Sequence, residues 1–542
     1  MMKNLKMNLS NKKITTKAAL LASAVALTLS SSCTKSFNEL NTNPISYTGE
    51  NFDPNFVLST AQLAYTGSND FAYDTWRANL IYASTMMQGL STVMSYWAGD
   101  KYQLTPGYTS AYWERAYDEQ VKRVVDLVEF TRDKPQYQNL HHLSRIWKAM
   151  VFQRITDLYG DIPYSEAGLG YYQSILYPKY DSQQSIYMDI LKEVDEATAA
   201  LDASQDAISG DMVYQGDIAK WKRFGATLML RMAMRLTKVD EATARSYAEK
   251  AIGNTFSSNN DNAFILHDES GGRVTQNRAA QVFLDGGQEH YYVKWSKTFI
   301  DVLQETADPR IAVAVTNLYP ATSSGSIPSS ASPNAAYITA AASQKGMPNG
   351  KDLSGIAGRD ISTDPSYSSI ADYSAPHPLM ISRVAPTFLL TYAEGELLLA
   401  EAALRWGIGG SAAEHYANGV RGSITYLSQW GSALTVSDAA AASYLTANPF
   451  VQASGLEQIS QQYWIHNCTT FNFYEVWSNW RRTGYPELTA INYVNNATQG
   501  TIPRRFPYPT AEESTNPEAY RAASASVTGG DLLTGRVWWD PQ

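Results

Sequence analysis

Residues 112–160 read YWERAYDEQVKRVVDLVEFTRDKPQYQNLHHLSRIWKAMVFQRITDLYG, and this stretch decides the fold. Its apolar residues recur three and four positions apart, the period of an α-helix. They are Trp113, Tyr117, Val121, Val124 and Val128, then Leu143, Ile146, Trp147, Met150, Ile155 and Leu158. Pro135 interrupts the pattern, and Gly160 is a typical helix end. The stretch therefore predicts two helices joined by a short turn.

The same pattern recurs along the chain. Helical stripes cover residues 187–201 and 218–236, and Asp217 is the expected N-cap of the second. Further helices are predicted over Glu241–Ile252, over Thr387–Trp406 and from Ser411 onward. Paired helices predict a mainly α fold with a tetratricopeptide-like scaffold at about 110–252 and 386–480, although no strict repeat of about 34 residues is visible.

Two segments lack this periodicity. Residues 253–385 are rich in Gly, Ser, Asn, Pro and Thr, with one helical pattern near Trp295–Gln304, and residues 65–106 are aromatic and loop-like with one expected helix near Trp76–Gln88. Long irregular segments inside a packed protein are usually functional or packed loops. We therefore expect a loop-rich binding face built from these two segments.

The first 33 residues are typical of a secretion signal. Five lysines precede the uncharged run Ala18–Leu29, and small residues lead to Cys33. The arrangement resembles a bacterial lipobox, which predicts a lipoprotein signal peptide at 1–32 and an acylated Cys33; an ordinary signal peptide with a chance cysteine is the alternative. A tether at 33–50 and a single domain at 51–542 would follow.

Composition narrows the function classes. The formal net charge is −9 with the signal lysines included, so nucleic acid is a poor partner. Only Cys33 and Cys468 are present, so acylation of Cys33 leaves no intramolecular disulfide.

Motifs of catalysis and metal binding are missing from the sequence. The seven histidines show no HExxH pattern, GxSxG is absent, and residues 346–352 only mimic a phosphate loop. Residues 259–262 are oxygen-rich but lack EF-hand spacing. No metal or cofactor is expected, whereas two carboxylates placed for glycoside cleavage remain open among 52 acidic residues.

Several longer motifs occur in one order along the chain. They are FNELNTNP (37–44), LYGDIPYSEA (158–167), MVYQGDIAKWKRFGATLMLRMAMRL (212–236), ADPRI (307–311), TYAEGELLLAEAALRWG (391–407), NWRRTGYPEL (479–488) and IPRRFPYPTAEESTN (502–516). Together with the lipobox, this set resembles the SusD/RagB family of Bacteroidetes surface lipoproteins, in its SusD-like branch, over essentially the whole mature chain.

The resemblance implies a tetratricopeptide-like scaffold with a loop-rich ligand face and no catalytic activity. It also implies a lipid-anchored outer-membrane protein, facing the cell exterior, that captures oligosaccharides for a SusC-like TonB-dependent transporter. Three alternatives stay open: a glycan-cleaving surface lipoenzyme, a peptide-binding RagB-like member, and a helical-repeat scaffold that binds only proteins.

Candidate ligand-binding residues follow by region. Aromatic rings stack on the apolar faces of sugars, and polar side chains bind hydroxyl groups. The expected platform comprises Tyr96, Trp97, Asp100 and Tyr102, with Asp74 and Arg77 nearby in sequence, and the expected opposing wall comprises Tyr291, Tyr292 and Trp295.

Overall fold

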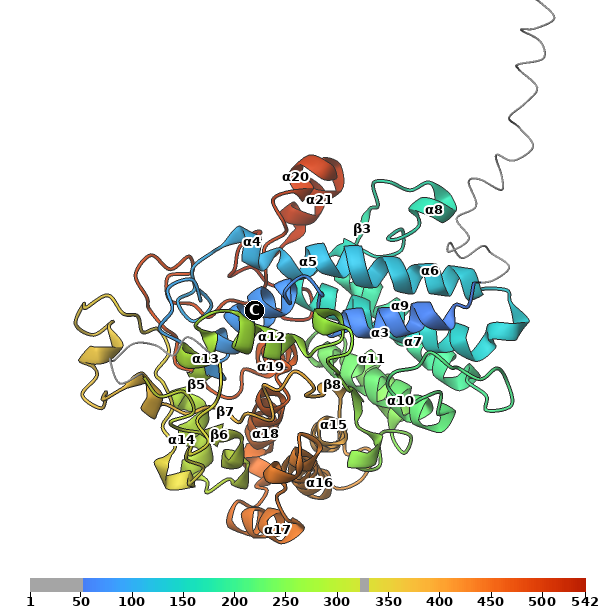
Figure 1. The fold of residues 1–542 in the computed structure, drawn as a ribbon. Coiled ribbons are helices and arrows are strands. Elements are labelled where there is room, and N and C mark those ends of the chain that lie inside the picture. The colour runs from blue at the N-terminus through green and yellow to red at the C-terminus, as the bar shows by residue number, and fades with distance from the viewer. Residues whose placement is uncertain (1–51, 322–330) are drawn as a thin grey trace, which may run out of the picture. The chain divides into compact units, whose positions relative to one another are not determined.

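The helix pair predicted from residues 112–160 forms in the computed structural model (Figure 1). Segments α5 (Ala111–Arg115), η2 (Ala116–Val121) and α6 (Lys122–Thr131) follow one another directly, with a π-helical turn in the middle. Helix α7 (Gln138–Tyr159) returns along α6 and ends at Gly160, whose φ of 88° suits glycine.

The structure describes residues 52–321 and 331–542. The predicted signal peptide, Cys33 and the tether lie outside the described residues.

The next helices continue the scaffold. Helices α9 (Gln183–Ala200), α10 (Ile218–Arg235) and α11 (Glu241–Ala251) pack in sequence, α9 also against α7. Each begins at a residue whose side chain accepts a backbone N–H from the first turn: Ser182, Asp217 and Asp240. The predicted cap at Asp217 is confirmed.

The second half of the scaffold begins with another helix pair. Helices α15 (Tyr392–Trp406) and α16 (Ala412–Thr425) lie against each other, and α17 (Asp438–Ala447), α18 (Gly455–Thr469) and α19 (Phe473–Thr483) complete this half. The prediction of one helix over Thr387–Trp406 is wrong at its start. Thr387–Leu390 forms strand β8, which pairs with β4 (Ala263–Ile265), and Thr391 then caps α15.

Shorter elements lie in the loop-rich segments and between the scaffold helices. Helices are α3 (Asn55–Tyr65), η1 (Thr75–Ser84), α4 (Pro106–Thr109), α8 (Gly170–Gln173), α12 (Arg278–Asp285), α13 (Glu289–Tyr292), α14 (Lys297–Glu305), α20 (Glu512–Thr515) and α21 (Pro517–Ser526). The remaining strands are β1 (Leu90–Ser91), β2 (Ile162–Pro163), β3 (Tyr180–Asp181), β5 (Lys294–Trp295), β6 (Ala314–Val315) and β7 (Ala375–Pro376). Antiparallel pairs β1–β5, β2–β3 and β6–β7 form two-stranded sheets. The prediction of a mainly α fold is confirmed, and no described helix has the length and apolarity to span a bilayer.

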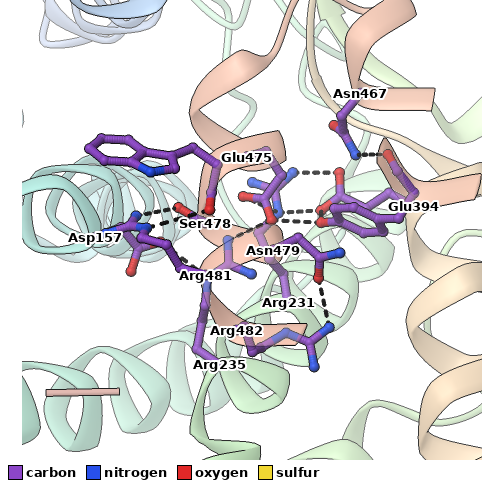
Figure 2. A network of polar contacts seen from close by, with 12 residues as sticks. Asp157, Arg231, Arg235, Glu394, Asn467, Glu475, Ser478, Asn479, Arg481 and Arg482 are labelled. Atoms are coloured by element: carbon purple, nitrogen blue, oxygen red, sulfur yellow. Dashed lines mark hydrogen bonds and ion pairs between the residues drawn. The ribbon is translucent and has the colours of Figure 1, made fainter. Parts of the chain in front are cut away.

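A buried network of polar and charged side chains joins helices α7, α10, α15, α18 and α19 of the scaffold (Figure 2). Arg231 of α10 binds Glu394 of α15 through Nε and Nη2, at 2.5 and 2.7 Å. One turn on, Arg235 binds Glu475 of α19 at 2.5 Å and Asp157 of α7 at 3.3 Å. The hydroxyl of Tyr463 on α18 donates to both Glu394 and Glu475.

The other acidic residues of α15 are paired in the same way. Glu401 binds Arg482 of α19 through both carboxylate oxygens and also binds Arg405, while Glu396 accepts a hydrogen bond from His415. The acidic side chains of this helix are thus paired within the scaffold.

The arginine-rich segments near the end of the chain hold its last segment in place. Arg481 donates to the carbonyl of Arg504, and Arg504 binds Asp540 at 2.7 Å. Arg505, which has no exposed surface, binds Asp531. The last segment is thus fixed to α19.

Replacing Glu475 tests the network. Burial alone would raise the pKa of Glu475, but Arg235 and Arg231 outweigh it and hold the pKa well below its usual range. Glu475→Gln leaves Arg235 buried without this charge, so we expect a loss of about 3–5 kcal/mol in the free energy of unfolding at neutral pH. The difference in unfolding free energy between the variant and the wild type should shrink as the pH falls below about 4. In that range protonation of the Glu475 carboxylate removes its stabilising contacts with the arginines in the wild type.

Urea unfolding followed by circular dichroism measures this effect. Glu249→Gln is the matched control, because Glu249 forms an exposed i,i+4 pair with Arg245. The control should change stability by less than about 0.5 kcal/mol. Equal effects of the two substitutions would contradict a stabilising role for the network.

Lys294 in β5 gives a second prediction. Its side chain is fully buried, Nζ has no hydrogen-bond partner, and burial lowers its pKa to about 7. The unfolded lysine has a pKa of about 10.4, so between pH 7 and 10 only the unfolded chain binds this proton and stability rises with pH. Lys294→Met should stabilise the protein by roughly 1–3 kcal/mol at pH 7, with a smaller gain at pH 10.

Urea unfolding of both proteins at several pH values measures the difference. Lys297→Met, at an exposed position in α14, retains Lys294 and should therefore keep the pH slope of the wild type. A Lys294→Met variant with the same pH slope as the wild type would rule out a neutral buried lysine.

Candidate ligand-binding site

A strained turn begins the candidate site. Phe71 and Ala72 are consecutive non-glycine residues with φ of 52° and 51°, in the left-handed region that such residues rarely adopt. Asp74 holds the turn by accepting the backbone N–H of Ser68 at 2.8 Å. The chain then enters η1, a ten-residue π-helix. Backbone strain and π-helical turns are both common at functional sites.

Aromatic rings gather around this turn. Phe71 packs edge-on against Trp76, with centroids 5.4 Å apart, and Trp76 against Tyr96 at 6.3 Å. The guanidinium of Arg77 lies 3.6 Å from the ring centroid of Tyr73 and 5.3 Å from that of Tyr108. We call this surface the aromatic face; it comprises Phe71, Tyr73, Trp76, Tyr96 and Tyr108, with Arg77. Tyr96 is its most exposed ring, at 38%, and the other rings are half-buried.

The aromatic face lies where the two loop-rich segments meet. The Tyr96 hydroxyl donates to Glu289 Oε1 at 2.5 Å, which joins residues 65–106 to residues 253–385. Strand pair β1–β5 makes a second connection, and Asp100 makes a third by accepting from Asn349 and from the backbone of Gly350. Burial raises the pKa of Glu289. The Glu289 carboxyl is buried, so its hydrogen bond with the Tyr96 hydroxyl holds the Tyr96 ring in place and leaves no charge at the surface.

The nine predicted ligand-binding residues divide by exposure. Tyr96, Arg77 and Tyr292 have accessible side chains. Trp97, Asp100, Tyr102 and Trp295 have no exposed surface, and Asp74 and Tyr291 are 1% and 6% exposed. The loops fold back on themselves: Asp100 is bound to Asn349 and Gly350, and Trp295 stacks on Phe299 with centroids 4.5 Å apart. In this conformation the side chains of these six residues are buried. A direct contact of any of the nine with ligand stays a prediction.

Sequence reasoning missed the other rings of the face. Phe71, Tyr73, Trp76 and Tyr108 were not among the predicted residues. A signal was present, because residues 71–77 read FAYDTWR and place three rings beside an arginine within seven positions. The sequence alone, however, does not show the strained turn at Phe71 and Ala72 beside which these rings lie.

A small cavity lies beside η1. Its volume is about 60 Å³. The lining side chains include Tyr65, Asn79, Tyr112, Arg154, Arg278 and Trp430. A second cavity of about 10 Å³ shares Tyr65 and Arg154 and extends to Asp157 and Glu475 of the buried network. The same helix thus presents Trp76 and Arg77 to the face and Asn79 to the cavity.

Metal-binding groups do not stand out in the described part of the chain. It contains no cluster of three or more His, Cys, Asp or Glu residues suited to a metal ion. Polar side chains of the oxygen-rich segment at 259–262 form hydrogen bonds within the protein. Asp261 accepts hydrogen bonds from Ser257, and the Asn259 amide donates one to the carbonyl of Gly422. The arrangement of the candidate site suits stacking and hydrogen bonding.

Solved structures with the same fold include a chitin-binding protein, which is 33% identical and matches 90% of this chain and 100% of its own length, with a TM-score of 0.77. A SusD-like protein of Bacteroidetes AC2a is 26% identical over 91% of this chain and 100% of its own, with a TM-score of 0.78. A chitin-binding SusD homologue from Flavobacterium johnsoniae is 24% identical over 90% and 98%, with a TM-score of 0.69, and shows the fold alone.

Sequence comparison agrees with the structural one. No curated protein matches the chain. The SusD-like family model, described as starch-binding and associating with the outer membrane, matches residues 53–509. This match covers more than half of the chain, which therefore belongs to the SusD-like family.

Proposed function

We propose that this protein captures oligosaccharides at the aromatic face and does not cleave them. The observation that carries the proposal is the clustering of five partly accessible rings around Arg77 at the junction of the two loop-rich segments. Rings offer stacking area to the apolar faces of sugars, and Arg77 and the tyrosine hydroxyl groups offer hydrogen bonds. The chitin-binding name of the relative that is 33% identical supports a glycan ligand.

Delivery to a transporter completes the proposal. An acylated Cys33 holds the protein at the outer membrane, facing the cell exterior, where it passes its ligand to a SusC-like TonB-dependent transporter. The family's description as associating with the outer membrane supports this location. Peptide capture is the second candidate, because exposed tyrosines also suit peptides.

Replacing Trp76 tests the face. Trp76→Ala removes the ring between Phe71 and Tyr96, so glycan affinity should fall roughly tenfold, or about 1.4 kcal/mol. Isothermal titration calorimetry against a panel of neutral oligosaccharides and peptides measures this, with chromatography of the mixture to detect cleavage products.

Tyr171→Ala is the control for this test. Tyr171 is an aromatic residue that is 90% exposed on α8, outside the aromatic face, so its loss should leave affinity unchanged. Saturable binding of peptides alone would replace the glycan proposal with the peptide one. Release of shortened glycans would show that the protein is an enzyme.

Replacing Cys33 tests the anchor. Cys33→Ala removes the thiol that is acylated, so the protein should leave the membrane fraction while its glycan affinity stays unchanged. Cell fractionation in a strain without the partner transporter gives the readout, and Cys468→Ala is the control. Continued membrane association of Cys33→Ala in that strain would refute lipid anchoring.

A further inference from the structure

We propose that a pocket between η5 (Asn259–Asp261) and helix α16 binds a sugar unit and is a second carbohydrate site, separate from the aromatic face. Its volume is about 270 Å³. We call it the α16 pocket; its lining includes Ser258, Asn260, Tyr392, Asn418, Arg421 and Gly422. The described residues of this lining are all different from those of the aromatic face. The choice of a glycan as the ligand rests on the proposed function.

Hydrogen bonds and a glycine fix the walls of the α16 pocket. Asn259 donates through Nδ2 to the carbonyl of Gly422 at 3.0 Å and to Thr425 Oγ1 at 2.9 Å. Tyr392, at the start of α15, donates its backbone N–H to Asn262 Oδ1 at 2.7 Å. A Cβ at Gly422 would lie 2.9 Å from Cδ1 of the Tyr392 ring, so glycine lets this ring lie against α16. The pocket is therefore built from three segments that are joined to one another.

Four side chains in this lining form no hydrogen bond or ion pair within the described part of the chain. They are those of Asn260, Tyr392, Asn418 and Arg421. Asn260, Asn418 and Arg421 are exposed, and the Tyr392 ring is half-buried. A ligand can therefore reach all four from solvent without a change in the fold.

These groups suit a sugar ring. The Tyr392 ring offers a flat apolar surface on which a sugar can stack. The two amides, the guanidinium and the phenol hydroxyl offer donors and acceptors, and each hydroxyl group of a sugar both donates and accepts. A water-sized group needs about 10–15 Å³ of such volume, so about 270 Å³ holds roughly 20 of them. This is more than the number of non-hydrogen atoms in one hexose.

The composition of the lining disfavours other ligands and reactions. The described residues that line the pocket include no acidic side chain, so the pair of carboxylates that most glycosidases use is missing there. Arg421 is the one cation among these described residues, which is too few for a polyanion such as nucleic acid. The same described residues include no aliphatic side chain to hold an apolar group of a peptide. A sugar unit with at most one negative charge matches this lining.

Titration of the mature chain with trisaccharides tests the inference. The probes are the trisaccharides of β-1,4-linked N-acetylglucosamine, β-1,4-linked glucose and α-1,4-linked glucose, and saturation-transfer difference NMR measures weak binding of each. The background variant Trp76→Ala/Arg77→Ala removes a ring and the guanidinium of the aromatic face, and it should still bind one of the probes. Adding Tyr392→Ala should weaken this remaining binding at least about tenfold, because the stacking surface is lost.

Two further variants keep the test decisive if Tyr392→Ala loses stability. Asn418→Ala/Arg421→Ala removes two of the free groups at exposed positions of α16, where alanine favours the helix. In the same background it should weaken binding to a similar extent. Tyr247→Ala is the matched control: Tyr247 is a half-buried tyrosine of α11 that does not line the pocket. It should leave binding unchanged.

The outcomes separate the two proposals. Loss of all binding in Trp76→Ala/Arg77→Ala, or remaining binding that neither pocket variant changes, would overturn the second site and leave capture at the aromatic face standing. Binding that Trp76→Ala/Arg77→Ala leaves at the wild-type level and the pocket variants abolish would overturn capture at the aromatic face and support the second site. A wild type that binds none of the trisaccharides would overturn this inference, and the wider glycan panel then decides the proposed function.

Discussion

The buried contacts of Arg231 and Arg235 with Glu394, Glu475 and Asp157 are the constraint on which the rest of the structure depends (Figure 2). Taking these charges out of water costs several kcal/mol for each ion. The ion pairs offset this desolvation cost only when α7, α10, α15 and α19 are all close enough for the side chains to pair. All of these charges are therefore paired only when the four helices take this arrangement.

A rigid scaffold allows the loop-rich face to carry strain. The turn at Phe71 and Ala72 costs free energy, and so does an unpaired acceptor at Asn79. Both lie beside η1, which packs against α19 of the network. Free energy gained in the scaffold thus holds the rings and Arg77 ready before a ligand arrives, which lowers the cost of ordering on binding.

The proposed glycan capture relies on the aromatic face. Stacking there would tolerate different sugars, because every pyranose has apolar faces. Contacts between distant segments, such as that of Tyr96 with Glu289, hold the rings in place.

The sequence by itself determined the helices whose apolar stripes are long and clearly ended. Helices α7, α9 and α10 form where periodicity, Asp217 and Gly160 place them, because these signals act within a few residues. The motifs also sufficed to identify the family, and the region of the candidate site was predictable because long aperiodic segments are rare in a packed domain.

Only the tertiary structure decided what depends on contacts between distant residues. Thr387–Leu390 is a strand because β4, more than 120 positions earlier, offers it a partner. Trp97 and Trp295 are buried and Trp76 is only half-buried, although all three belong to the two loop-rich segments, because exposure is set by how these segments pack on each other. The cavity beside Asn79 belongs to the same class, since its walls come from residues 65 to 474 and no local pattern brings them together.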